Sequence, residues 1–588
     1  MAIDLQQEAN KALQSLNSGQ FNPALKTARA AIKSAPREAF FYNIAGLALS
    51  GMGKERDAIA YYQKALALNP DYLEVQKNLA QALFLMGKHD KVKSVLDRLL
   101  AKHPDDGDAL YLMAVSLTQL GEFATADGFA TRAIETGVNP ARSLNLRGII
   151  RQNRDNLTDA ISDFEQAVNL TPDNAETLAN YSFALALKGL AEDALAALQR
   201  ALEIAPDHVN ALQRMGGLLN QMGRKDDSIA TFRRLLGVAP GHPGALSALA
   251  GLQDRAENAA MIPQLTAAFS RAPKGALDRT DLAFALWSAY KQAGDLPEAE
   301  KWLLLGNKNA AAMRPYDVSH SIAQQEKIFA LFPQGAPLPE NPTDSGPMPI
   351  FVLGLIRSGT TLTEQILSAN SAVFGAGEMA TAGFVYQSLF DDITDLTPDI
   401  AAEFARQYRA NLPDMPTGAT AFVDKMPGNF RLIGFLLAAF PNCKIINLVR
   451  DPRDTGLSAF SNDFPAQGLN YTYDLKSLAD QFNFYRATIN RWEALFPGRI
   501  LHHEYASMVR DVEATSHKLA AFCELDWEPS MARPQDNTRA VMTASVNQVR
   551  AGVHTKSLAG WKKHATMLQP FIDALDPALW PELADENS

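Results

Sequence analysis

Prolines that recur every 34 residues are the feature that most constrains how this chain can fold. They are Pro36, Pro70, Pro104, Pro172, Pro206 and Pro240, and the one 68-residue step covers two periods whose junction carries Pro140. A fixed period of this length indicates a repeat architecture, in which each unit is one supersecondary element stacked on the next. Because proline stops a helix, each period is expected to end one helix before the next unit begins.

Small and large residues recur at fixed offsets within the periods. In the period that ends at Pro70 they are Tyr42, Gly46, Ala58, Tyr62 and Ala65. The period that ends at Pro172 has Leu144, Gly148, Ala160, Phe164 and Ala167 at the matching positions. Small residues let two antiparallel helices approach closely, and large residues fill the space between neighbouring units. The pattern resembles the tetratricopeptide repeat, a helix–turn–helix unit of 34 residues.

The repeats predict an α-helical superhelix over residues 1–310, with about eight or nine units. The last unit is expected between about residue 282 and residue 306. Such an array has a concave face. The resemblance implies that this groove binds a protein partner or a peptide, and the alternative is a structural spacer.

Bulk composition excludes several classes of protein. The chain of 588 residues carries a net charge of −10, which argues against general binding to nucleic acid or to an anionic membrane. Two cysteines, Cys443 and Cys523, are too few for a disulfide framework or a four-cysteine zinc site. We see no signal peptide and no apolar run long enough to cross a membrane, so a cytoplasmic protein is expected.

The pattern changes after the repeats. Residues 311–348 are predicted to be a linker, because 333–348 are rich in Pro, Gly and polar residues. In 349–588 short apolar runs alternate with helical patterns, which predicts an α/β domain of P-loop type with a parallel sheet. The clearest strands are expected at 350–353, 444–449 and 500–503.

The first of these strands runs into a glycine loop and then a helical pattern. Gly354 and Gly359 have the spacing of the nucleotide triphosphatase loop, and Thr361 stands at its Ser/Thr position. Thr360 replaces the lysine that serves the β- and γ-phosphates, which argues against ATP or GTP. The backbone N–H groups at the start of the helix form an anion site.

The segment 351–362 resembles the 5′-phosphosulfate loop of sulfotransferases, and most closely that of the tyrosylprotein sulfotransferase branch. The resemblance implies that the donor co-substrate is 3′-phosphoadenosine 5′-phosphosulfate (PAPS). It implies that its 5′-phosphate and sulfate are held by Arg357, Ser358, Gly359, Thr360 and Thr361. Arg357 would also stabilise charge on the transferring group, and the chemistry requires no metal.

A second phosphate site is expected at the end of the strand 444–449. Arg450 ends this strand and Ser458 lies eight residues further on, so that a charged fork and a short hydroxyl donor can converge on one phosphate. The pair looks like the 3′-phosphate motif of sulfotransferases. The tyrosylprotein sulfotransferase branch, which is eukaryotic, has a further arginine near the position of Asn462, and asparagine cannot supply the charge of that arginine.

The resemblance also assigns roles in catalysis. Glu378 matches the general base, and Lys425 matches a lysine that neutralises charge on the sulfate or the leaving phosphate. Tyr505 matches a tyrosine that contacts the nucleotide. Ser545, in the segment 543–550, matches a serine that hydrogen-bonds the donor and belongs with the catalytic set. Gly560 stands where a basic residue is expected, with Lys562 and Lys563 close by.

The sequence leaves the acceptor open. A peptide tyrosine guided by the repeats, and a sugar or small-molecule hydroxyl, are both compatible with these motifs. Two further alternatives are a repeat scaffold with a catalytically silent sulfotransferase-like domain and a P-loop kinase, which Thr360 disfavours.

Overall fold

The computed structural model describes residues 5–154, 156–341, 344–390, 393, 395–464, 468–537, 553–555 and 557–584. It divides into two compact units, Met1–Arg214 and Met215–Ser588. Each unit is considered by itself below.

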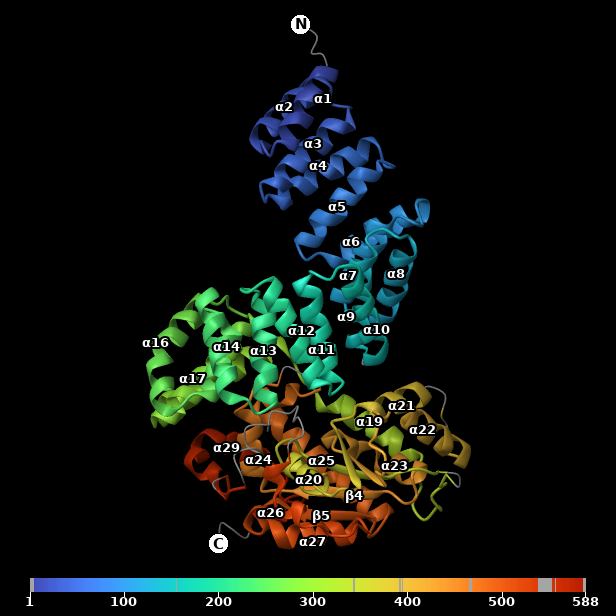
Figure 1. Ribbon diagram of the computed structural model, residues 1–588, viewed down its shortest axis with the longest axis vertical. Helices are drawn as coiled ribbons and strands as arrows, with labels where there is room; N and C mark the ends of the chain where they lie inside the picture. The colour runs from blue at the N-terminus through green and yellow to red at the C-terminus, as the bar shows by residue number, and fades with distance from the viewer. Residues whose placement is uncertain are drawn as a thin grey trace. The chain divides into compact units, whose positions relative to one another are not determined.

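The first unit consists of antiparallel helix pairs, as Figure 1 shows in blue and blue-green. Its helices are α1 (Leu5–Asn17), α2 (Phe21–Ser34), α3 (Ala39–Gly51), α4 (Glu55–Leu68), α5 (Leu73–Leu85), α6 (His89–Lys102), α7 (Gly107–Gln119), α8 (Phe123–Glu135), α9 (Pro140–Asn153), α10 (Leu157–Leu170), α11 (Ala175–Leu187) and α12 (Ala191–Ile204). The boundary between the units falls inside α13 (Val209–Gln221). The predicted helical array is confirmed.

The repeated glycines bring the two helices of a pair together. A Cβ atom built on Gly148 of α9 would lie 2.8 Å from the ring of Phe164 on α10, and a Cβ on Gly46 of α3 would clash with Tyr62 on α4. Tyr62 and Phe164 are both buried. The sequence pattern of small and large residues therefore records contacts between paired helices.

The second unit begins with helices and continues into a sheet. The helices are α14 (Lys225–Val238), α15 (Pro243–Leu252), α16 (Arg255–Arg271), α17 (Leu277–Ala293), α18 (Leu296–Met313) and α19 (Val318–Ala330). Helix α19 lies inside the segment 311–348 that the sequence predicts to be a linker. It forms because Ile328 and Phe329 bury apolar surface, and Phe329 packs on Trp492 with the ring centroids 4.6 Å apart.

The sheet is parallel throughout and has the strand order β2-β3-β1-β4-β5. The strands are β1 (Met348–Gly354), β2 (Val373–Gly377), β3 (Ala421–Asp424), β4 (Lys444–Val449) and β5 (Ile500–Glu504). The α-helices of this part are α20 (Thr360–Leu367), α21 (Thr381–Phe390), α22 (Pro398–Ala410), α23 (Ile433–Ala439), α24 (Pro452–Phe460), α25 (Leu475–Leu495), α26 (Tyr505–Arg510), α27 (Val512–Phe522) and α29 (Ala565–Ala574). The predicted parallel α/β domain is confirmed.

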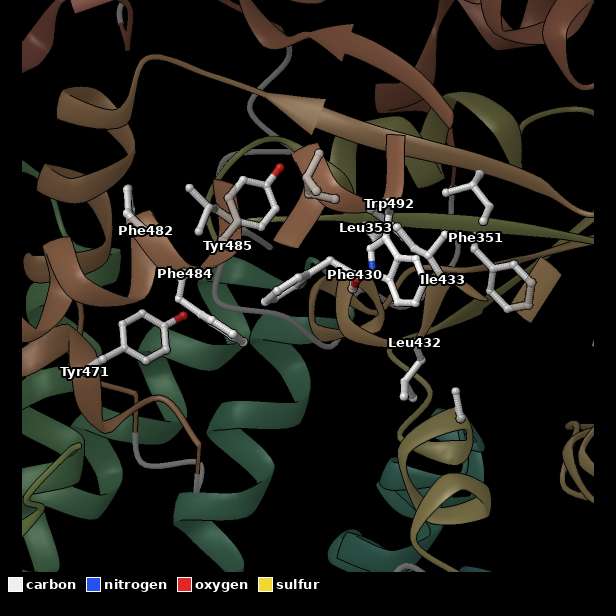
Figure 2. Packing of buried hydrophobic residues seen from close by; sticks show 14 of the residues in the cluster. Phe351, Leu353, Phe430, Leu432, Ile433, Tyr471, Phe482, Phe484, Tyr485 and Trp492 are labelled. Atoms are coloured by element: carbon white, nitrogen blue, oxygen red, sulfur yellow. Dashed lines mark hydrogen bonds between the residues drawn. The ribbon is translucent and has the colours of Figure 1, made fainter. Parts of the chain in front are cut away.

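Both faces of the sheet are covered, which explains why its central strand is continuously apolar. On β1, Ile350 and Val352 pack into a cluster with α20, α26 and α27. Phe351 and Leu353 point to the other face, into a core that includes α22, α23 and α25. Figure 2 shows this second core, where the indole N–H of Trp492 donates to the carbonyl oxygen of Phe430 at 3.0 Å.

The same core extends into the preceding helices. Trp287 of α17, Leu303 of α18 and Phe329 of α19 belong to the cluster that contains Phe351 and Trp492. Within the second unit, these helices and the sheet thus share one hydrophobic core. In the part of the chain that the structure describes, no helix is both long and apolar enough to span a membrane.

Candidate functional site

The two predicted phosphate motifs meet at the carboxyl edge of the sheet. Strand β1 pairs with β4 in parallel, with Gly354 opposite Leu448. Strands β3 and β4 are consecutive in the chain but lie on opposite sides of β1. Open parallel sheets bind ligands at such a point, outside the carboxyl ends of the strands. The loops that follow β1 and β4 both open there.

The loop after β1 has a backbone that few residues adopt. Gly354, Arg357 and Gly359 have φ angles of 146°, 66° and 111°. Gly359 caps α20 and leaves no room for a side chain, because a Cβ atom there would lie 2.5 Å from Cδ2 of Tyr505. Positive φ at the non-glycine Arg357 costs conformational energy, and such strain gathers at functional sites.

The hydroxyl of Ser358 has no hydrogen-bond partner among the described residues, although the side chain is only 1% exposed. It precedes the first turn of α20, whose initial N–H groups have no partners within the helix. A buried polar atom without a partner is costly and calls for an explanation. An anion at the start of α20 would supply that partner.

Two arginines from the two loops lie side by side. Arg450 donates from Nη1 to the carbonyl oxygen of Arg357 at 2.8 Å, and Arg357 donates from Nε to the hydroxyl of Ser458 at 3.1 Å. Burial, and then the neighbouring charge of Arg450, lowers the pKa of the Arg357 guanidinium to about 10. The Nε of Arg450 has no partner within the described part of the chain. Two adjacent cations at this edge suit a ligand with more than one negative charge.

Tyr505 and Ser557 complete this group. The guanidinium of Arg450 lies 4.5 Å from the ring centroid of Tyr505 and donates from Nη2 to the carbonyl oxygen of Ser557 at 3.0 Å. The hydroxyls of Tyr505 and Ser557 are 3.0 Å apart. Sequence reasoning found Tyr505 but missed Ser557, which lies beyond the segment 543–550 that it singled out.

Glu378 and Lys425 form a second group. They follow β2 and β3, which are neighbouring strands, and their side chains form an ion pair. The Lys425 side chain is 0% exposed, whereas that of Glu378 is 45% exposed. Glu364 of α20 accepts a hydrogen bond from the backbone N–H of Gly377 at 2.9 Å. The glycine-loop helix is thereby tied to the strand end that carries Glu378.

A buried carboxyl group lies directly before Lys425. Asp424 accepts hydrogen bonds from the Tyr408 hydroxyl at 2.8 Å and from the Asn429 amide at 3.0 Å. Burial raises the pKa of Asp424 to about 7. Asp424 thus fixes the end of β3, from which Lys425 reaches Glu378.

The remaining expected positions are placed as follows. Asn462 donates from its amide to the carbonyl oxygen of Ser458 at 2.7 Å, so its side chain is turned back onto α24. Lys562 and Lys563 are exposed. Ser545 lies outside the described residues. Among the residues that are described, no group of three or more His, Cys, Asp or Glu side chains could hold a metal ion.

Comparison with known proteins gives families for both parts of the chain. Residues 349–529 match the model of the sulfotransferase family. One tetratricopeptide-repeat model matches residues 49–116 and 185–252, and a second such model matches 145–209.

Individual relatives are distant. An uncharacterized protein of Aquifex aeolicus is 30% identical over 314 residues, which are 50% of this chain and 41% of that protein. This chain thus spans less than half of that relative. A Caenorhabditis briggsae protein named "Putative protein-tyrosine sulfotransferase" is 24% identical over 234 residues, 36% of this chain and 80% of that one. Among solved structures, YrrB, "a TPR protein with an unusual peptide-binding site", is 25% identical and covers 32% of this chain and 95% of its own, with a TM-score of 0.28.

The helix pairs, the glycine loop at the edge of a parallel sheet and the matches to family models agree with one another. This chain carries tetratricopeptide repeats followed by a domain of the sulfotransferase family.

Proposed function

We propose that this protein is a PAPS-dependent sulfotransferase that transfers a sulfuryl group to a hydroxyl acceptor. The observation that carries the proposal is the convergence of Arg357, Arg450 and Ser458 beside the unpartnered hydroxyl of Ser358. Such a site offers two cations and hydroxyl donors at the start of a helix, where a phosphate or sulfate binds well.

The two ends of the donor would be held by the two loops. Arg357 through Thr361 would hold the 5′-phosphosulfate, and Arg450 with Ser458 would hold the 3′-phosphate. Tyr505, against which Gly359 packs, would contact the nucleotide. Asn462 adds no charge to this set because its amide is neutral, and that amide donates to the backbone of α24.

Glu378 and Lys425 would serve the transfer itself. The acceptor hydroxyl attacks the sulfur atom, a new O–S bond forms, and the bond between sulfur and the bridging phosphate oxygen breaks. The carboxylate of Glu378 takes the hydroxyl proton, and its partly exposed position lets an acceptor approach it. The ammonium of Lys425 and the guanidinium of Arg357 would stabilise the charge that develops on the leaving group. The products are a sulfate ester and 3′,5′-adenosine bisphosphate.

A peptide tyrosine is the acceptor that we propose, with the repeats binding the acceptor protein or a partner. The likeness to the Caenorhabditis briggsae protein supports this choice, as do the repeats themselves. Transfer from labelled PAPS to tyrosine peptides, simple phenols and sugars would decide between acceptor classes. Labelling of sugars alone would overturn the peptide assignment and leave the donor site intact.

The donor site is tested first, by calorimetric titration of the full chain with 3′,5′-adenosine bisphosphate and with ATP. We expect binding that ATP does not reproduce, and a loss of about 1.5–3 kcal/mol for Arg450→Ala, as for a charged hydrogen-bonded group. Arg510→Ala is the control, because Arg510 is exposed on the helix that begins with Tyr505. A folded protein that binds no bisphosphate at millimolar concentration would refute the enzyme proposal and favour a scaffold.

A further inference from the structure

A short helical segment near the C-terminus connects α17 and α18 with the proposed donor site. The segment is η5, a 3₁₀ helix from Gly560 to His564. Its last residue, His564, is 4% exposed and lies against both helices. The Nδ1 atom of His564 is 2.7 Å from Oε1 of Glu300 on α18, and its ring meets that of Trp287 on α17 edge-on, with centroids 5.4 Å apart.

The other side of the segment is fixed to α24. Asp454 accepts hydrogen bonds from the backbone N–H groups of Ala559 at 2.7 Å and of Trp561 at 2.9 Å. The guanidinium of Arg453 lies 4.2 Å from the ring centroid of Trp561. Helix α24 also carries Ser458 and begins two residues after Arg450. The segment is therefore held between the helices that precede the sheet and the helix of the second phosphate motif.

The residues just before η5 contact the proposed donor site directly. Ser557 lies two residues before Ala559, and its carbonyl oxygen accepts a hydrogen bond from Nη2 of Arg450. Its hydroxyl meets that of Tyr505. With Nη1 bound to the carbonyl oxygen of Arg357, these contacts set the plane of the Arg450 guanidinium. Orientation matters because a planar fork recognises phosphate through paired N–H donors.

We propose that Glu300 and His564 are positioning residues for nucleotide binding: they fix η5, and through it hold Ser557 against Arg450 and Tyr505. The inference rests on the proposed donor site. Under this proposal the helix pair α17–α18 supports the geometry of the donor site, in addition to any role in binding partners. Glu300 touches no phosphate itself and acts only through the position of Arg450.

The test measures affinity for the 3′-phosphate separately from affinity for the rest of the nucleotide. Full-length wild type, Glu300→Ala and Glu298→Ala are titrated with 3′,5′-adenosine bisphosphate and with adenosine 5′-phosphate. Glu298 is the matched control, because it lies on the same helix but pairs with Lys301 on the surface. For Glu300→Ala we expect the bisphosphate Kd to rise by about 3–10-fold, in the range of networked residues, while the 5′-phosphate Kd changes by less than about twofold.

Three further variants separate positioning from general damage. Glu300→Gln keeps an oxygen acceptor for His564 and is expected to bind like wild type. His564→Phe keeps an aromatic ring against Trp287 but loses the bond to Glu300, so it should weaken bisphosphate binding as Glu300→Ala does. It provides the test if Glu300→Ala folds poorly. In an Arg450→Ala background, Glu300→Ala should add little further loss, because the effect passes through Arg450.

The possible contrary results point to different errors. Equal weakening of both nucleotides, or additive losses with Arg450→Ala, would overturn the positioning role and indicate a structural one. Unchanged bisphosphate binding in both Glu300→Ala and His564→Phe would also overturn it and leave the donor site standing. Absence of bisphosphate binding by the wild type would instead remove the proposed function on which the inference rests.

Discussion

The ion pair between Glu378 and Lys425 predicts an unequal effect of removing its two members. Lys425 is fully buried and Glu378 is its only ionic partner among the described residues, whereas nearly half of the Glu378 side chain is exposed. Glu378→Gln leaves a buried ammonium without a counter-charge. Breaking a buried pair in this way lowers the free energy of unfolding by about 3–5 kcal/mol. Because Glu378 is partly exposed, we expect a smaller loss of about 1–3 kcal/mol.

Lys425→Met should behave differently. The apolar side chain suits the buried site, and the carboxylate that remains at Glu378 reaches solvent. Replacement of a buried ion pair by hydrophobic residues is often neutral, and here only the Lys425 end of the pair is fully buried, so we expect stability within about 1 kcal/mol of wild type. The double variant should resemble Lys425→Met. Under the proposed mechanism both single variants lose transfer activity by about 10²-fold or more.

Tryptophan fluorescence during urea unfolding measures these differences. All six tryptophans lie between residues 287 and 580, so the signal comes from the second unit alone. Equal destabilisation by Glu378→Gln and Lys425→Met, or a larger effect of Lys425→Met, would refute the reasoning. Either result would mean that the Lys425 ammonium itself stabilises the fold, and is not a destabilising buried charge that Glu378 only offsets.

Three further predictions use the same fluorescence assay together with calorimetry. Gly359→Ala should lower stability and weaken bisphosphate binding, because its Cβ would meet Tyr505. Gly498 also has a positive φ but has open space around it, so Gly498→Ala should affect only stability. Equal bisphosphate binding by the two variants would contradict this prediction. Ser358→Ala should weaken bisphosphate binding while stability stays the same or rises by up to about 1 kcal/mol, since the hydroxyl is buried without a partner, and a clear loss of stability would count against that description. Burial raises the folded-state pKa of Asp424 to about 7, so the stability that its protonated form contributes should be lost as pH rises from about 4 to about 7. Asp424→Asn should therefore flatten the plot of the urea midpoint against pH in this range. An unchanged slope would show that other groups cause the pH dependence.

The parts of the site that the sequence predicts lie on strongly patterned elements. The glycine loop follows the apolar strand β1, and Arg450 directly follows the apolar strand β4. Because these strands are neighbours in a parallel sheet, the motifs at their ends meet, and the contact between Arg450 and Arg357 is the result. Their roles in binding PAPS stay predictions.

Other parts were beyond reach for physical reasons. Three of the five residues of β2 are glycine or alanine and β3 has only four residues, so neither strand gives a clear pattern. The contact of Glu378 with Lys425 depends on the pairing of these two strands. The bond between Glu300 and His564 joins residues 264 positions apart. Periodicity describes which face of an element is buried, but it does not say which distant segment covers that face.

The packing of α19 bears on where a shortened form of this chain can begin. Phe329 and Phe332 of this region bury their rings against Trp492, with centroids 4.6 Å and 5.2 Å apart. Each buried aromatic side chain is worth about 1.5–3 kcal/mol. A fragment of the chain that begins at residue 349 would lack both rings and would expose part of this indole to water. A stable shortened form of the sulfotransferase domain should therefore begin upstream of α19.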